Sequence, residues 1–495
     1  MTISVSQFFI DPTSSEGLQT QLKERIVSAI LRRRFPPNAR MPASRKLASH
    51  LGVARITVAL AYQDLISDGY LVSRPRSGVF VATDPPELMA RDRPNHAASI
   101  DWSARLGPLL ADARRVHKPA NWRSYPYPFV YGQVDNALFP HDSWRTCARQ
   151  ALGKREFHEV SADAGSRDDA RLVAYTLSHS LPTRGIEARD DELLITLGAQ
   201  NGMWLAIESL RRGRPSYRVA VEDPCYPELR EILRCSGVQV EPVPVDEHGM
   251  ILDHLPNGCD LVCVAPSHQA PTGASLSRDR RRELLKRAER DDFLILEDDY
   301  DFEMSFLRPP SPALKAYDAE GRVIYIGSYS KPLFPGLRLG YMVAPAPLIH
   351  AARTLRSASI RHPPGMTQRT AAHFLALGHY NAHVDRMKRV FAKRRSLMEH
   401  ALAKTGFKAQ NDGGHGGASL WVATPNGSDS QVLAEHARSL GVLIEAGVDF
   451  FLDPQPTPLF RIAYSSITED RIEAGVNLLA EAVDMTETPG LTARL

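Results

Sequence analysis

The sequence predicts an α/β protein in two parts, a small helical module and a large domain with a mostly parallel sheet. Its 495 residues correspond to about two to four domains of ordinary size. Residues 1–85 hold 11 Lys and Arg against 6 Asp and Glu, a net charge of +5, and the remainder has a net charge of −2. From residue 126 onward, short apolar runs alternate with helical stretches, which is typical of a helix-covered parallel sheet.

The composition is that of a soluble globular protein. Hydrophobic residues make up 43% and charged residues 24%, which excludes disordered, collagen-like and disulfide-scaffold classes. No apolar run approaches the roughly 20 residues that span a bilayer, and the N-terminus does not resemble a signal peptide, so we expect no membrane association. Five scattered cysteines favour free thiols and a cytoplasmic location. Cys259 and Cys263 flank an apolar strand, which predicts buried thiols and no metal site.

An amphipathic helix is the first element expected, because Leu18, Leu22, Ile26 and Ile30 recur every four residues before Pro36-Pro37 stops the pattern. A second helix is expected at residues 44–51 with Ser44 as its N-cap, then a turn at Gly52 and a third helix at residues 54–67. Two short helices joined through a glycine turn are typical of a helix-turn-helix.

A β-hairpin with basic residues should follow, formed by strands at residues 70–73 and 79–82 around the turn Arg74-Pro-Arg-Ser-Gly78. This order of elements favours a DNA-binding module over a solvated helical bundle with a basic face. Major-groove docking would place Arg55 and Thr57 at base edges or phosphates, and Ser44 and Arg45 against the DNA backbone. The residues predicted to contact DNA are Ser44, Arg45, Arg55, Thr57, Arg74, Arg76 and Gly78.

Residues 86–125 mix prolines with polar and charged residues, which predicts a linker with one short helix around residues 102–114. The large domain then extends over residues 126–495, with strands expected at residues 192–196, 218–222, 261–265, 293–297 and 323–327. Loops at the carboxyl ends of such strands can together form one site.

The loop Gly327-Ser-Tyr-Ser-Lys-Pro-Leu-Phe-Pro-Gly-Leu-Arg338 suits an aldehyde cofactor with a phosphate group. The amine of Lys331 would form a Schiff base, and Ser328, Ser330 and Arg338 would hold the anion. A carboxylate of Glu297-Asp-Asp-Tyr300 could pair with a protonated ring nitrogen, as pyridoxal 5'-phosphate (PLP) requires when it acts as an electron sink.

Two families resemble these segments. Residues 18–81 resemble the winged helix-turn-helix of the GntR family of bacterial transcription regulators, through Arg40-Met-Pro-Ala-Ser-Arg-Lys-Leu-Ala48, Leu51-Gly-Val-Ala-Arg-Ile-Thr-Val58 and Asp68-Gly-Tyr-Leu71. Arg76 and Ala54 depart from the usual Gly and Ser. Residues 126–495 resemble the fold-type I PLP-dependent aminotransferases.

The second resemblance implies a role for each matching residue. Lys331 would bind the cofactor aldehyde, Asp298 the pyridine nitrogen, and Tyr300 the phenolic oxygen. Ala199 and Gln200 match the helix start that binds the phosphate, and Tyr226 matches the aromatic side chain that stacks on the ring. Arg461 matches the arginine that grips an amino-acid carboxylate. Ala270 departs from the aromatic residue or Asn usual before Pro271.

The combination resembles the MocR-type branch of the GntR family. That resemblance implies a homodimeric regulator that binds paired half-sites on double-stranded DNA, with PLP as cofactor. Its effector would be PLP itself or an amine or amino acid that exchanges with Lys331 (aldimine exchange), and its target genes would serve vitamin B6 or amine and amino-acid metabolism. Known members of that branch regulate vitamin B6 synthesis, or the use of amines and amino acids such as γ-aminobutyrate, taurine or ectoine derivatives.

Two other hypotheses are compatible with parts of the sequence. The large domain is a working aminotransferase in one and only a dimerisation scaffold in the other. The complete set of cofactor-binding residue types argues against a scaffold. We expect regulation rather than turnover as the primary role, although Lys331, Asp298, Tyr300 and Arg461 leave a residual transamination half-reaction open.

Overall fold

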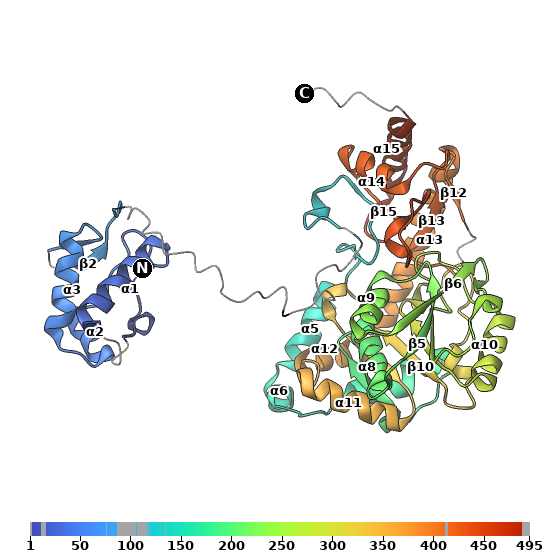
Figure 1. The fold of residues 1–495 in the computed structure, drawn as a ribbon, viewed down its shortest axis with the longest axis horizontal. Coiled ribbons are helices and arrows are strands. Elements are labelled where there is room, and N and C mark those ends of the chain that lie inside the picture. The colour runs from blue at the N-terminus through green and yellow to red at the C-terminus, as the bar shows by residue number, and fades with distance from the viewer. Residues whose placement is uncertain are drawn as a thin grey trace. The chain divides into compact units, whose positions relative to one another are not determined.

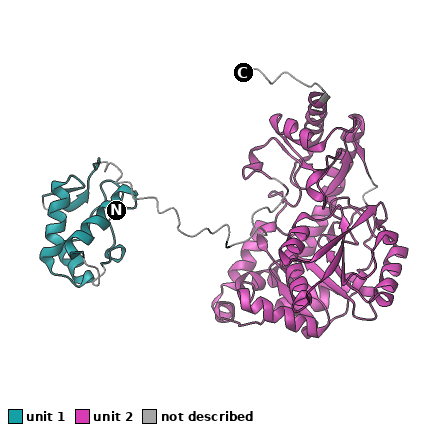
Figure 2. Cartoon of the chain, in the orientation of Figure 1, with its two compact units in different colours: residues 1–105 teal, residues 106–495 magenta. Residues whose placement is uncertain are grey.

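The computed structural model describes residues 2–10, 16–75, 77–86, 105, 116, 118–133, 135–410 and 414–487. The chain forms two compact units, residues 1–105 and 106–495 (Figure 2). Arg76 lies outside the described residues, as does the helix expected at residues 102–114 apart from Arg105.

The first unit is a winged helix-turn-helix. Its elements are α1 (Leu18–Leu31), α2 (Ser44–Leu51), α3 (Arg55–Ser67), β1 (Leu71–Arg74) and β2 (Gly78–Val81). The two strands pair antiparallel, and Leu22, Ile26, Leu47, Val58 and Leu65 form a core from which water is excluded. The predicted order of helices and hairpin is therefore confirmed.

Two local predictions in this unit are wrong. Ala43, and not Ser44, is the extended residue that precedes α2, so Ser44 is already helical and no side chain caps the helix. Helix α1 ends at Leu31, before Pro36, because Arg33 adopts a left-handed φ of 55°. The amides of Arg34 and Phe35 then bond back to the carbonyl of Ala29 at 2.9 and 3.1 Å.

The second unit contains two sheets and their covering helices. Its helices of the α type are α5 (His141–Ala151), α6 (Lys154–Ser161), α7 (Ala170–Tyr175), α8 (Ala199–Arg211), α9 (Pro227–Ser236), α10 (Arg278–Arg290), α11 (Ala346–Ile360), α12 (Gly365–Ala376), α13 (His379–Lys404), α14 (Ser430–Ser439) and α15 (Glu469–Glu487). Within the described ranges, none of the helices has the length and apolarity that a membrane crossing demands.

The large sheet has eight strands in the order β4-β11-β10-β9-β8-β5-β6-β7. These are β4 (Leu193–Thr196), β5 (Arg218–Asp223), β6 (Gln239–Asp246), β7 (Gly249–Met250), β8 (Leu261–Val264), β9 (Leu294–Asp299), β10 (Val323–Ser328) and β11 (Gly340–Val343). The five predicted strands are all present. Strands β6, β7 and β11 were not predicted. Strand β11 lies antiparallel between β4 and β10, and β7 is antiparallel to β6, so the sheet is mixed.

Helices lie on both faces of the large sheet (Figure 1), and alternate residues of the central strands pack against opposite layers. On β10, Ile324 and Ile326 pack with residues of α8, α9 and α11, whereas Val323 packs on the other side with residues of α10. Because both faces are buried, β10 is apolar from Val323 to Ile326 and carries its hydroxyl residue, Ser328, at its end.

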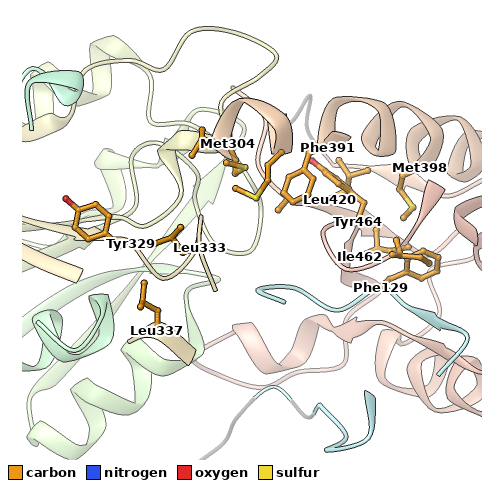
Figure 3. Packing of buried hydrophobic residues seen from close by; sticks show 14 of the residues in the cluster. Phe129, Met304, Tyr329, Leu333, Leu337, Phe391, Met398, Leu420, Ile462 and Tyr464 are labelled. Carbon is orange, nitrogen blue, oxygen red and sulfur yellow. The ribbon is translucent and has the colours of Figure 1, made fainter. Parts of the chain in front are cut away.

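A smaller antiparallel sheet, ordered β12-β13-β16-β15, follows near the C-terminus. It consists of β12 (Lys408–Ala409), β13 (Ser419–Ala423), β15 (Glu445–Ala446) and β16 (Leu459–Ala463), while β14 (Val442–Leu443) pairs with β3 (Tyr127–Pro128). One apolar cluster extends from Leu333 after β10, through Met304 and Phe391, to Leu420 and Ile462 of this sheet (Figure 3). That shared core holds β16 in a defined position relative to the loop after β10.

Gly340 offers a test of how closely β10, β11 and the start of α8 are packed. A Cβ atom at Gly340 would lie 2.7 Å from the carbonyl oxygen of Gly327 and 3.0 Å from the backbone of Gly198. Gly340→Ala should therefore lower the free energy of unfolding by about 1–3 kcal/mol, measured by urea denaturation. Gly336→Ala is the control, because its Cβ would only approach Phe334 at 4.0 Å. Equal stability of the two variants would contradict this packing argument.

Candidate functional site

A cavity of about 290 Å³ opens at the carboxyl ends of the parallel strands of the large sheet. Every residue that the sequence placed in a cofactor or effector site lines this one cavity: Ala199, Gln200, Tyr226, Asp298, Tyr300, Ser328, Ser330, Lys331, Arg338 and Arg461. The topology explains the convergence, because β4, β5, β9 and β10 all end at this edge and β11 begins there.

Lys331 lies three residues beyond β10, with its amine among aromatic rings. Its Nζ atom is 4.5 Å from the ring centre of Tyr131 and 5.6 Å from that of Tyr300. Burial, followed by the nearby charge of Arg461, lowers the pKa of the Lys331 ammonium. A lysine whose neutral form is favoured in this way is suited to attack a carbonyl carbon.

Asp298 is the middle member of three consecutive acids at the end of β9, and it alone faces the cavity. Glu297 accepts hydrogen bonds from the amides of Leu314 and Lys315 at 2.7 and 2.8 Å. Asp299 is paired with the buried Arg184 at 2.7 Å. The alternation of side chains along a strand separates these two acids from Asp298.

The carboxylate of Asp298 has no hydrogen-bond partner for its buried Oδ1 atom among the described residues. Burial raises the pKa of Asp298 to about 7, although the charge of Lys331 opposes the shift. A buried carboxylate normally has a cationic or hydrogen-bonding partner. A protonated pyridine nitrogen would provide one, so this residue fits the cofactor that the sequence suggested.

An anion-binding corner lies at the start of α8. The Arg338 guanidinium donates to the carbonyl of Leu197 at 3.1 Å, and a Cβ at Gly198 would lie 3.3 Å from the same group. Gly198 has a left-handed φ of 81°, so a side chain there would both strain the backbone and fill the corner. The N-terminus of α8 and the guanidinium together suit a phosphate.

The two serines of the loop differ in their contacts. The Ser328 hydroxyl accepts from the amide of Ser330 at 3.2 Å, and both side chains are buried. The Ser330 hydroxyl donates to the carbonyl of Leu339 at 3.2 Å and accepts from its amide at 3.0 Å. Ser330 therefore connects the loop that carries Lys331 to Leu339, the residue before β11, through two hydrogen bonds.

Arg461, on β16, lines the cavity from the small sheet. Its Nε atom donates to Glu445 at 2.6 Å, and the guanidinium lies 4.3 Å from the ring centre of Tyr131 and 4.6 Å from that of Phe450. Glu445 occupies one side of the guanidinium, so its terminal nitrogens are the donors left for a ligand.

Several cavity residues were not predicted from the sequence. Tyr131 donates to Asp301 at 3.1 Å, and Asp301 also bonds to the buried His268 at 2.8 Å. Glu445 and Lys118 also line the cavity. Asp301 follows Tyr300 directly and His268 lies in a segment that resembles aminotransferases, so these two were accessible to sequence reasoning. No local pattern marks Tyr131, Glu445 or Lys118.

In the first unit, Arg45 and Arg55 are exposed near the starts of α2 and α3, and Ser44 and Thr57 are half-buried beside them. Gly78 opens β2 with a left-handed φ of 109°.

Arg74, also exposed, donates to Asn38 at 2.6 Å and lies 4.5 Å from the ring centre of Phe80. The described residues predicted to contact DNA thus lie on the two helix starts and the hairpin.

Comparisons with known proteins agree with both units. Residues 18–81 match the bacterial regulatory proteins of the gntR family, and residues 141–479 match the class I and II aminotransferases. The HTH-type transcriptional regulator TauR of Rhodobacter capsulatus is 49% identical over 98% of this chain and 100% of its own.

Two further relatives cover most of the chain. The HTH-type pyridoxine biosynthesis transcriptional regulator PdxR of Corynebacterium glutamicum is 32% identical over 79% of this chain and 80% of its own. Among solved structures, the α-aminoadipate aminotransferase LysN of Thermus thermophilus, complexed with N-(5'-phosphopyridoxyl)-L-leucine, has a TM-score of 0.69 and 25% identity. It covers 78% of this chain and 99% of its own.

A winged helix-turn-helix joined to an aminotransferase fold defines a class of transcription regulators, and regulation rather than catalysis is their primary role. This chain belongs to the gntR family of bacterial regulatory proteins, in its MocR-type branch.

The raised pKa of Asp298 makes a prediction about stability. Because its folded pKa of about 7 exceeds the ordinary value of 3.8, ionisation of Asp298 costs folding free energy that grows as the pH rises between these values. Asp298→Asn should therefore unfold at a higher temperature than the cofactor-free wild type at pH 8, and this difference should shrink at pH 5. Thermal unfolding followed by circular dichroism measures it.

Asp299→Asn is the matched control at the neighbouring position. It removes the buried partner of Arg184 and should lower the melting temperature. If Asp298→Asn is no more stable than the wild type at pH 8, the buried carboxylate is not the unpaired group described above.

Proposed function

We propose that the protein is a transcription regulator that binds PLP at Lys331 and senses PLP itself, or an amine or amino acid that exchanges with Lys331. It would act in the cytoplasm as a homodimer on paired half-sites, and control genes of vitamin B6 or of amine and amino-acid metabolism. The supporting observation is Asp298, whose buried Oδ1 has no hydrogen-bond partner among the described residues and which lines the same cavity as Lys331 and Arg338.

Each end of the cavity would hold one part of the cofactor. Arg338, Ser328 and the first amides of α8, at Ala199 and Gln200, would hold the phosphate. Asp298 would accept a hydrogen bond from the ring nitrogen, Tyr300 would donate to the ring's phenolic oxygen, and Tyr226 would cover the ring face. Bound there, PLP supplies an aldehyde that primary amines join reversibly.

The effector would lie between Lys331 and Arg461. Its amine would displace the Lys331 amine, and a carboxylate on it would meet the terminal nitrogens of Arg461. The choice between amines would then depend on the distance between the reacting carbon and the arginine. A sensor of PLP itself would use only the Lys331 end of this arrangement.

Regulation requires that ligand binding favour one conformation of the protein over another. Arg461 and Lys331 belong to different parts of the second unit, β16 of the small sheet and the loop after β10 of the large one. A ligand that contacts both would favour the conformation in which the two sheets are held together. That preference is the differential affinity on which a response at the DNA would depend.

Lys331→Ala tests the cofactor assignment. The purified wild type with added PLP should show the absorbance band of lysine-bound cofactor. The variant should lose it because Lys331 is the lysine near Asp298, whereas Lys118, the other lysine of the cavity, lies near Glu445 and Arg461. Lys393→Ala, which removes an exposed lysine paired with Glu469, should keep the band. A band of unchanged intensity in Lys331→Ala would overturn the assignment.

Arg55→Ala tests the DNA-binding assignment, with a fluorescent duplex from the intergenic DNA beside the protein's own gene. The variant should bind about tenfold more weakly, and log K should fall less steeply with log salt concentration if the lost contact is to phosphate. Arg25→Ala on α1 is the control, because Arg25 lies against Phe9 at 3.6 Å and is not predicted to face DNA. Wild-type binding by Arg55→Ala would show that α3 was wrongly assigned.

A further inference from the structure

Lys118 lies in the part of the chain that leads from the first unit into β3, within the segment predicted to be a linker. It nevertheless lines the cavity of Lys331 and Arg461, together with Val116. Two described residues of the predicted linker, both in the second unit, therefore form part of the wall of the ligand cavity. No other described residue of that predicted linker lines it.

The Lys118 ammonium is a half-buried charge without a direct partner. Among the described residues it forms no ion pair within 4 Å and no hydrogen bond, although it lies close enough to Glu445, Glu228 and Arg461 for their charges to affect it. Burial lowers the pKa of Lys118 first, and the two glutamates oppose that shift. An incoming anion would relieve the cost of keeping this ammonium charged away from bulk water.

Arg461 differs from Lys118 because one of its nitrogen atoms is already hydrogen-bonded to a carboxylate of the protein. Glu445 is bonded to its Nε atom at 2.6 Å and accepts the amide of Tyr131 at 3.3 Å through its other oxygen. The carboxylate of Glu445 thus accepts hydrogen bonds from both the Arg461 guanidinium and the Tyr131 backbone amide. At this end of the cavity an anionic ligand group would meet two cations, and Lys118 is the one without a direct protein partner.

We propose that Lys118 is a specificity residue that contacts the anionic group of the effector together with Arg461. The ligand class that this arrangement selects is a primary amine with an acidic group, such as a carboxylate or a sulfonate, over an amine without one. Because Lys118 belongs to the predicted linker, the same contact would connect the filled cavity to that part of the chain. This inference rests on the proposed function, since it requires an amine effector at Lys331.

The test uses the full-length protein with PLP bound and follows the cofactor absorbance during titration. The probes are γ-aminobutyrate, β-alanine and 2-aminoethanesulfonate, compared with propylamine and ethylamine, which lack the acidic group. The wild type should bind at least one acidic amine more tightly than the matched plain amine. Lys118→Met should reduce that preference about tenfold, the usual value of one charged hydrogen bond, and leave the affinity for the plain amine unchanged. Lys118→Arg should restore most of the preference.

Lys393→Met is the control. Lys393 is an exposed lysine paired with Glu469 and does not line the cavity, so its loss should leave every affinity unchanged. If Lys118→Met shows the preference of the wild type, the inference is wrong. If the wild type itself shows no cofactor band, or no response to any amine, the proposed function fails, and this inference fails with it.

The role of Lys118 in coupling has a separate readout. In the wild type, a saturating concentration of the preferred acidic amine should change the Kd for the intergenic duplex. In Lys118→Met, saturated with the same amine at a higher concentration, that change should be smaller. A change of equal size in both proteins would show that Lys118 selects the ligand but does not transmit its presence, and would overturn this part of the proposal.

Discussion

The site depends on one constraint, the cost of burying the carboxylate of Asp298 without a counter-ion. Three acids end β9. Both oxygens of Glu297 accept backbone amides, and Oδ2 of Asp299 accepts from Arg184 and, at 2.8 Å, from the hydroxyl of Tyr325, although Oδ1 of Asp299 has no hydrogen-bond partner among the described residues. Because side chains alternate along a strand, Asp298 faces the opposite side, where no described residue is hydrogen-bonded to its Oδ1 and a ligand would supply the partner.

The remaining features of the large unit form the cavity around this carboxylate. Strand β11 brings Arg338 beside Gly198 at the start of α8, where glycines allow the backbones to approach closely. The apolar cluster that joins the two sheets holds Arg461 opposite Lys331. The fold is that of an aminotransferase, and the same arrangement that favours catalysis in such a fold also gives a regulator a chemically selective binding site.

The proposals for the regulator share a physical basis in the distribution of charge around the cavity. Arg338 and Asp298 would be neutralised by the cofactor, and Glu445 partly neutralises Arg461. Lys118 has no such direct partner among the described residues, and it lies in the chain segment that continues to the DNA-binding unit. Ligand recognition and the connection to that unit would then share one side chain, which requires no long chain of contacts between distant sites.

The sequence by itself determined the two-part organisation, the five central strands and the residues at their ends. This was possible because Lys331, Asp298 and Arg338 lie in local motifs whose chemistry depends on nearby residues, and because apolar periodicity fixes which strands are buried. It misplaced the cap of α2, where the extended conformation of Ala43 decided the helix start. It also omitted β11, a short strand whose position between β4 and β10 depends on pairing with distant residues. Only the tertiary structure could show that Tyr131, Glu445 and Lys118 line the same cavity. Glu445 is more than 300 residues from the other two in the sequence. The three residues come together because the two sheets pack on a shared core, and no local pattern indicates it.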